Sequence, residues 1–159
     1  MSIQTFSQWL YATPLAVAFR EMVWFIPTVQ TIHILAIAIL VGAALVSNLR
    51  LAGIIATDEA PAAVVRRYLP WMGPALIVLL STGLLLVIAE PGRTLGNTVF
   101  WVKMVLVLSG FALTRGFQKP ALALQPVGAA PVALAKPAAW LSLAVWAAVI
   151  FCGRFIAYT

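Results

Sequence analysis

The sequence is poor in the residues that most catalytic and metal sites need. It contains one cysteine, one histidine and four acidic residues among 159. Cys152 therefore cannot form a disulfide within one chain, and a single His33 with a single Cys152 excludes a Cys/His metal cluster. We find no nucleophile–base pair, no carboxylate dyad and no phosphate-binding loop. Hydrolytic chemistry consequently has no residues that could perform it.

Charge is scarce as well. Charged residues make up 9% of the chain and hydrophobic residues 64%, whereas a soluble domain carries about 25% charged residues. The composition therefore excludes a soluble domain. The net charge of +6 comes from ten lysines and arginines that stand singly or in one pair. That scatter favours the loops of a membrane protein over a nucleic-acid-binding face, so we expect a lipid bilayer and no nucleic acid as partner.

What is present instead is a set of long apolar runs. A membrane-spanning helix needs about 20 residues, and four windows approach or exceed this length: residues 24–47, 69–89, 98–113 and 138–158. Each must be helical, because every backbone polar group in lipid needs a partner within its own segment. We therefore predict an all-α integral membrane four-helix bundle that forms a single transmembrane domain over residues 1–159.

Two segments outside these windows also allow structural predictions. Residues 2–21 mix apolar and polar side chains and predict an N-terminal interfacial helix, with Thr13 as N-cap and Pro14 at the first helical position. A plain extension of the first span is the alternative. Four prolines between the third and fourth windows, at positions 120, 126, 131 and 137, predict an extended connection.

The basic residues predict the orientation. Six lie in the first and third connections between spans and two lie on the opposite side. Because cytoplasmic loops carry the excess of lysine and arginine, we predict a protein of the bacterial inner (cytoplasmic) membrane with both termini on the periplasmic side. The two groups are Arg50, Arg66, Arg67, Arg115, Lys119 and Lys136, against Arg20 and Arg93.

Ionisable residues within the spans are costly in lipid and need a reason. There are three, His33, Lys103 and Arg154, and on this topology they collect in the outer leaflet together with Gln30. His33 is the deepest, about 13 Å from the outer end of its span. The cytoplasmic half of the bundle is expected to be almost purely apolar.

Each of these residues has a structural and a functional interpretation. His33 is either a neutral core histidine, bonded to a backbone carbonyl or to Gln30, or a ligand of haem iron. Lys103 and Arg154 either extend to the outer interface or bind a ligand. Trp101 either belongs to an aromatic belt at the span ends or lines a porphyrin pocket.

Several stretches of the chain resemble a family of small bacterial four-helix membrane proteins of unknown function. More distantly, the chain is similar to the membrane domain of copper-resistance protein D and to the HemJ-type protoporphyrinogen oxidase. The second of these groups depends on one histidine and one lysine, and the matching positions here are His33 and Lys103. The residues that carry the first resemblance are Trp9, Thr13, Pro14, Thr31, His33, Asn48, Arg50, Gly53, Pro70, Trp71, Thr82, Gly83, Asn97, Phe100, Lys103, Gly153, Arg154 and Tyr158.

These observations lead to a hypothesis with two alternatives. We expect a b-type haem protein in which His33 binds the iron, Lys103 is the second ligand or a propionate partner, and Arg154 is a propionate partner. Its function would be electron transfer or a redox step involving porphyrin or quinol, and whether it is an enzyme stays open. Ligation by two histidines would require a homodimer. The alternatives are a transport protein for a proton, an anion or a copper ion, and a structural subunit bound to partner membrane subunits.

Overall fold

The computed structural model describes residues 2–123 and 135–156, and in these ranges it contains seven helices and no strand. The predicted all-α fold class is thereby confirmed. Four of the helices are long, namely α3 (Phe25–Ala52), α4 (Pro61–Ala89), α6 (Thr98–Ala123) and α7 (Ala135–Phe155). Each contains a stretch long and apolar enough to cross a membrane, so the chain has the helices of a membrane protein.

The helix ends lie beyond the apolar windows where local capping permits it. At the end of α3, Gly53 adopts a left-handed conformation with φ of 80°, and its N–H donates to the Arg50 carbonyl at 3.0 Å. This is a common helix ending that favours glycine. Helix α4 begins at Pro61, where the missing proline N–H costs no hydrogen bond. Apolar windows mark the part of a helix that suits lipid, whereas caps mark where the helix stops.

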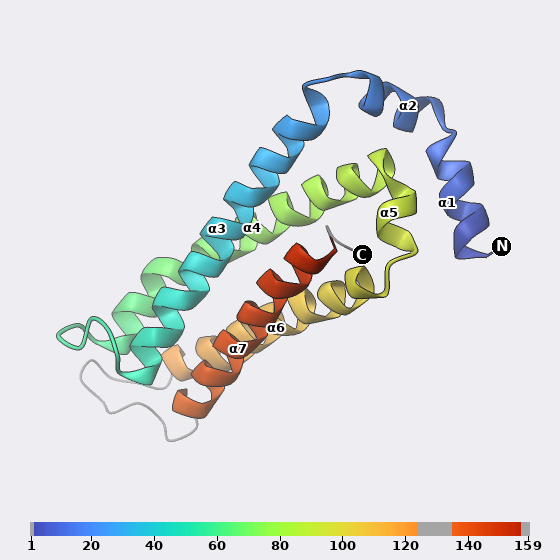
Figure 1. Ribbon diagram of the computed structural model, residues 1–159. Coiled ribbons are helices and arrows are strands. Elements are labelled where there is room, and N and C mark those ends of the chain that lie inside the picture. Colours follow the sequence, from blue (N-terminus) through green and yellow to red (C-terminus); the bar gives the residue numbers. More distant parts are fainter. Residues whose placement is uncertain (1, 124–134, 157–159) are drawn as a thin grey trace.

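Three short helices gather at one end of the four long ones (Figure 1). They are α1 (Ile3–Tyr11), α2 (Pro14–Glu21) and α5 (Pro91–Leu95), and α1 packs against α5. Thr13 accepts a hydrogen bond from the Ala16 N–H at 3.3 Å and Pro14 is the first residue of α2, as the sequence predicts. The N-terminal segment therefore contains two helices rather than one.

Arg20 connects this N-terminal segment to the bundle. Its Nη1 donates to the Ala89 carbonyl at 3.1 Å, and its Nη2 donates to the Tyr11 carbonyl at 2.8 Å. The guanidinium thus satisfies a free carbonyl at the C-terminal end of α4, where a positive charge is also favoured by the helix dipole. One side chain therefore joins α1, α2 and α4.

The proline-rich connection is only partly described. Pro120 lies inside α6, which continues to Ala123, and Pro137 lies in the first turn of α7. Pro126 and Pro131 lie outside the described residues, together with most of the predicted extended connection.

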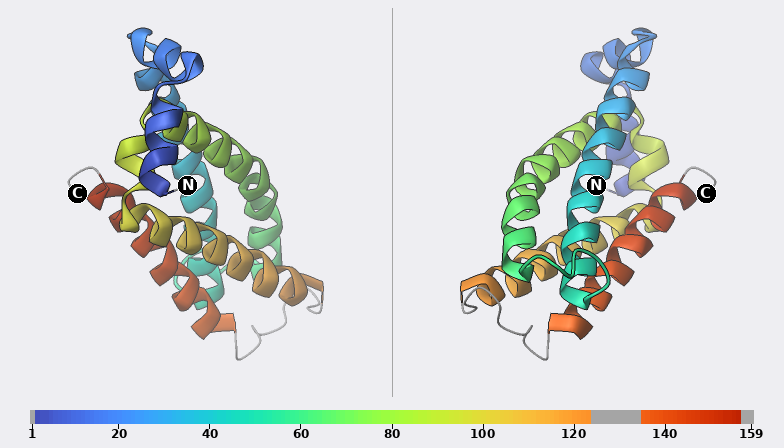
Figure 2. Two further views of the ribbon diagram at one scale, coloured as in Figure 1. Left: turned by 90° about the vertical axis from the view of Figure 1, so that its right-hand side faces the viewer. Right: turned by 90° about the vertical axis from the view of Figure 1, so that its left-hand side faces the viewer.

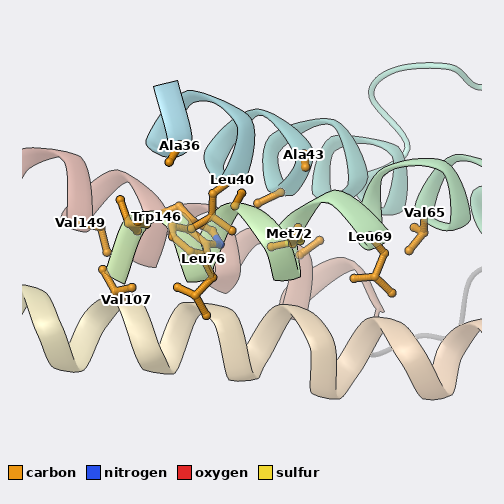
Figure 3. Packing of buried hydrophobic residues seen from close by; sticks show 14 of the residues in the cluster. Ala36, Leu40, Ala43, Val65, Leu69, Met72, Leu76, Val107, Trp146 and Val149 are labelled. Atoms are coloured by element: carbon orange, nitrogen blue, oxygen red, sulfur yellow. The ribbon is translucent and has the colours of Figure 1, made fainter. Parts of the chain in front are cut away.

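The long helices form two pairs that pack on each other. Helix α3 packs along α4, α6 along α7, and α3 also contacts α7. Figure 2 shows that α4 is curved, and it has Pro70 and Pro74 in its interior, a common cause of bending. Leu40, Met72 and Trp146 are at the centre of the buried cluster between the pairs (Figure 3). We refer to the end with α1, α2 and α5 as the His33 end and to the opposite end as the Arg50 end.

A buried polar network lies toward the Arg50 end. Asn48 Nδ2 donates to Ser142 Oγ at 3.0 Å, and Ser142 Oγ and Thr114 Oγ1 are also 3.0 Å apart. Thr114 Oγ1 donates to the Gly110 carbonyl at 2.7 Å and accepts from Trp146 Nε1 at 3.3 Å. The prediction that this half is almost purely apolar was therefore wrong. It rested on charged residues, whereas the network consists of neutral ones from α3, α6 and α7.

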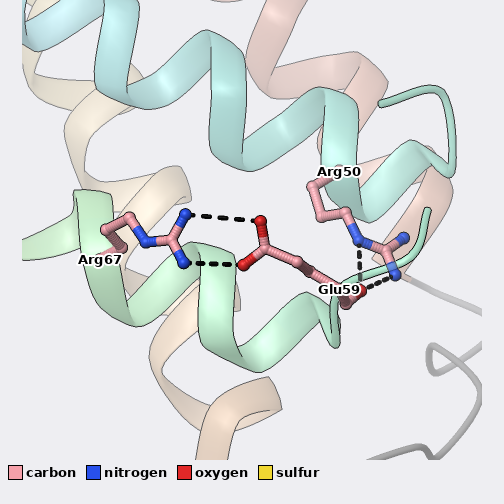
Figure 4. A network of polar contacts seen from close by, with 3 residues as sticks. All are labelled: Arg50, Glu59 and Arg67. Carbon is pink, nitrogen blue, oxygen red and sulfur yellow. Dashed lines mark hydrogen bonds and ion pairs between the residues drawn. The ribbon is translucent and has the colours of Figure 1, made fainter. Parts of the chain in front are cut away.

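The α3–α4 connection at the Arg50 end is held by Glu59, which bonds two arginines (Figure 4). Arg50 is buried and donates to the Glu59 backbone carbonyl from Nε at 3.0 Å and also from Nη2. Arg67 Nη2 lies 2.7 Å from the Glu59 carboxylate. Two of the basic residues at this end are therefore already satisfied within the protein.

Candidate cofactor site at the His33 end

The His33 side chain lies against helix α4. Its Nδ1 is 2.8 Å from Thr82 Oγ1, and Thr82 Oγ1 is 2.7 Å from the Val78 carbonyl. A hydroxyl has one proton, and the usual use of a threonine inside a helix is to donate it to the carbonyl four residues earlier. Thr82 Oγ1 therefore accepts a hydrogen bond from His33 Nδ1–H. The hydrogen-bond pattern assigns the Nδ1–H tautomer to a neutral His33.

The remaining ring nitrogen of His33 is available. The imidazole also makes a hydrogen bond with the backbone of Leu79 on α4, and within the described part of the chain no side chain is paired with Nε2. In the Nδ1–H tautomer this atom carries a free lone pair, which is the form of imidazole that binds metals. A half-buried imidazole with one nitrogen anchored and the other free can act as a ligand.

Gly83 allows the imidazole to approach the backbone of α4. A Cβ atom at this position would lie 3.4 Å from His33 Cε1, so the ring lies almost directly on the helix surface. Thr82 and Gly83 together form the support of His33, one by hydrogen bonding and one by the absence of a side chain. The same two residues belong to the stretches that carry the family resemblance.

Lys103 lies against helix α7 in a similar way. A Cβ atom at Gly153 would be 3.7 Å from both Cε and Nζ of Lys103. The lysine is near enough to His33 and to Cys152 to interact with each electrostatically. Among the residues that the structure describes, however, no hydrogen bond or salt bridge reaches its ammonium group. A half-buried cation without a counter-charge is costly in an apolar bundle.

All four long helices contribute to this region. His33 comes from α3, Thr82 and Gly83 from α4, Lys103 from α6 and Gly153 from α7. The sequence predicted that His33 and Lys103 both lie in the outer leaflet, and the structure brings them within electrostatic range. Their supports on the neighbouring helices were not predicted. A threonine followed by a glycine inside an apolar span is the signal in the sequence that could have identified the first support.

The other predicted site residues are less closely involved. Arg154 follows Gly153 in the last turn of α7, and its side chain is exposed. Gln30 is exposed one turn before His33, and the histidine bonds Thr82 in its place. Trp101 is 48% exposed and donates from Nε1 to the Leu95 carbonyl at 3.0 Å, which fixes it at the start of α6.

The donor set distinguishes between kinds of metal site. Among the described residues no group of three or more His, Cys, Asp or Glu side chains could hold a metal ion. A bare ion would therefore find fewer than three such ligands among the described residues. A haem supplies four equatorial nitrogens of its own, so a single histidine is sufficient. The residues present fit a haem better than an ion.

The comparisons with known proteins give a family but no function. A family model described as "Family of unknown function (DUF6644)" matches residues 22–159. Neither the curated proteins nor the solved structures contain a match to the chain. Because the matched region includes all four long helices, His33 and Lys103, the chain belongs to this family, and both α1 and α2 precede the matched region.

Proposed function

We propose that this DUF6644 protein is a membrane-embedded b-type haem protein in which His33 is an axial ligand of the iron. The observation that carries the proposal is the hydrogen bond from His33 Nδ1 to Thr82, which leaves Nε2 free. Histidines that bind metals almost always donate their other ring N–H to a nearby acceptor, which fixes the tautomer and the ring orientation. The distant similarity to HemJ-type proteins inferred from the sequence suggested the same histidine, although the comparisons with known proteins show no link to that group.

Lys103 and Arg154 would bind the propionates of the haem. The ammonium of Lys103 has no counter-charge within the described residues, and a carboxylate would supply one. Arg154 is adjacent in sequence to the glycine on which Lys103 lies, and a guanidinium forms paired hydrogen bonds with a carboxylate. One anionic metal cofactor would thus satisfy both the free imidazole nitrogen and the unpaired cation.

The activity that follows is electron transfer, or a redox step on a porphyrin or quinol, at the side of the membrane predicted to be periplasmic. When bound, the haem supplies one-electron exchange. The chain's own contribution is to hold the imidazole on Thr82 and Gly83, to neutralise the propionates, and to keep water away through the apolar helices. These tasks need no acidic residue, and none of the four lies in the interior of a span.

A reduced-minus-oxidised absorption spectrum of the detergent-purified protein tests the proposal, with the haem quantified as its pyridine complex. We expect a b-type spectrum. One haem per chain would indicate His33 as the only histidine ligand, whereas one haem per two chains would indicate a homodimer with two histidine ligands. A protein that stays colourless after haem is added would contradict the proposal and favour the transport or structural-subunit hypotheses.

The role of Lys103 can be tested with a substitution that keeps its charge. Arginine stays protonated and cannot ligate iron, yet it pairs well with carboxylates. If Lys103 is a propionate partner, Lys103→Arg should retain haem with an unchanged spectrum. If Lys103 is the second iron ligand, the same variant should lose the low-spin spectrum. Lys136→Arg, which makes the same change at the Arg50 end, is the control.

A further inference from the structure

We propose that the seam between α4 and α6 at the Arg50 end binds the phosphate headgroup of one anionic phospholipid through Arg66 and Arg115. The proposal is independent of the haem at the opposite end. It follows from the basic side chains that the protein does not satisfy by itself, and from the apolar surface that continues from them along α4.

Arg115 is fixed in the seam. Its Nη1 would be 3.5 Å from a Cβ atom at Gly73, so the guanidinium lies on the surface of α4 although the residue belongs to α6. The guanidinium carbon also lies 5.6 Å from the centre of the Phe111 ring. Within the described part of the chain, no hydrogen-bond acceptor or carboxylate is paired with it. Arg115 is thus a positioned cation whose donors are free.

Arg66 lies on the same face of α4 as Gly73. The two are seven residues apart, which is about two helical turns or 10 Å along the axis. The Arg66 side chain is exposed, and no partner for it occurs among the described residues. Arg50 and Arg67 differ, because Glu59 satisfies both of them (Figure 4). Arg66 and Arg115 are therefore free to bind an external anion.

The surface beyond the two arginines suits an acyl chain. Ile77 and Leu84 follow Arg66 and Gly73 on the same face of α4, and they are 67% and 61% exposed. A basic headgroup site followed by an apolar stripe has the polarity of a phospholipid. Guanidinium groups bind phosphate through paired hydrogen bonds, and basic sites between helices on the cytoplasmic side are known to take anionic headgroups. The positive-inside prediction puts this end on that side.

Native mass spectrometry of the delipidated full-length protein tests the assignment. Phosphatidylglycerol and phosphatidylcholine with identical acyl chains are added back to wild type, to Arg66→Gln/Arg115→Gln and to Lys136→Gln. We expect one phosphatidylglycerol per wild-type chain. Each free arginine near the surface contributes a factor of about five, so the double variant should bind about 30-fold more weakly. Lys136→Gln removes a charge at the same end but on α7, and it should keep the bound lipid.

Each contrary result overturns the proposal. Equal retention of phosphatidylcholine would exclude an anion site. An equal loss in Lys136→Gln would indicate diffuse attraction rather than a seam. Displacement of the lipid by millimolar inorganic phosphate would indicate a small-anion site in place of a lipid site. Circular dichroism checks the fold of the double variant, and if it is unfolded, the exposed Arg66→Gln variant alone should bind about fivefold more weakly.

Discussion

The two polar regions of the bundle differ in whether their hydrogen bonds are complete. In the network of Asn48, Thr114, Ser142 and Trp146, each of the four side chains is bonded to another side chain of the group. At the His33 end, His33 Nε2 and the Lys103 ammonium have no partner among the described residues. Satisfied networks rigidify a core, whereas unsatisfied ionisable groups in a membrane helix point to a ligand. The two regions therefore differ in whether their polar side chains have hydrogen-bond partners, and not in how deeply those side chains are buried.

Ser47 is an exception in the structural region. Its Oγ is buried and lacks a hydrogen-bond partner in the part of the chain described. A neutral hydroxyl in this situation costs about 1–3 kcal/mol. Lys103 Nζ also has no hydrogen-bond partner among the described residues, but it is not fully buried. The comparison between the two regions therefore depends on His33 and Lys103, not on counting every unpaired atom.

The two polar regions are also separated from each other. His33 and Asn48 are 15 residues apart on α3, or about 22 Å. The buried residues of α3 between them are mostly alanines and Leu40, with Ser47 next to Asn48. Leu40 packs there with Leu76 and Val107 from the neighbouring helices (Figure 3). Along α3, apolar side chains therefore separate the two regions, which weighs against the transport hypothesis.

The largest effect is expected from removing the side chain that accepts a hydrogen bond from His33. Thr82→Val keeps the side-chain shape but removes the oxygen that accepts from His33 Nδ1. Loss of such a partner typically weakens metal binding 10- to 100-fold, so we expect haem affinity to fall by about that factor in a titration of the haem-free protein. Thr31→Val is the matched control, because Thr31 donates only to Pro27 of its own helix. Equal affinities in the two variants would contradict the role of Thr82.

A smaller effect should follow from crowding the structural region. At Gly110 a Cβ atom would lie 3.1 Å from Val145 Cγ1 and 3.3 Å from the Trp146 ring. Overpacking of this kind costs about 1–3 kcal/mol, so Gly110→Ala should lower the free energy of unfolding in detergent. Gly42→Ala is the control, because nothing lies within 4 Å of its added Cβ. If Gly110→Ala is as stable as Gly42→Ala, the close contact of α6 and α7 is not as described.

The smallest effect on stability is expected from removing one hydroxyl group from the network around Asn48. Thr114→Val leaves the Trp146 N–H without its acceptor and Ser142 without one partner. Hydrogen bonds between membrane helices contribute about 0.6 kcal/mol on average and up to about 1.7, so the unfolding free energy should fall by about 1 kcal/mol. Haem content per folded chain should not change. A Thr114→Val protein that is folded but free of haem would contradict the claim that this network is purely structural and that only the His33 end binds the cofactor.

The sequence predicts the fold and the two central residues, because lipid makes both conspicuous. Long apolar windows identify the four helices, and His33 and Lys103 stand out as ionisable groups inside them. Thr82, Gly83 and Gly153 could not be assigned, because the rotation of each helix depends on packing that a single sequence does not give.

The network around Asn48 was missed because asparagine, serine and threonine lower the hydropathy of a span only slightly. The contacts of Glu59 were not predicted, and its two arginine partners lie eight or nine residues away along the chain.

The most direct test of the account compares haem content in two variants prepared side by side. His33→Ala removes the proposed iron ligand, and Thr114→Val disturbs only the structural network. The ratio of haem to folded protein, measured with the pyridine complex on membrane-inserted and purified samples, should fall to near zero in His33→Ala. It should equal the wild-type ratio in Thr114→Val. Undiminished haem in His33→Ala would contradict the central claim that the free nitrogen of His33 holds the cofactor.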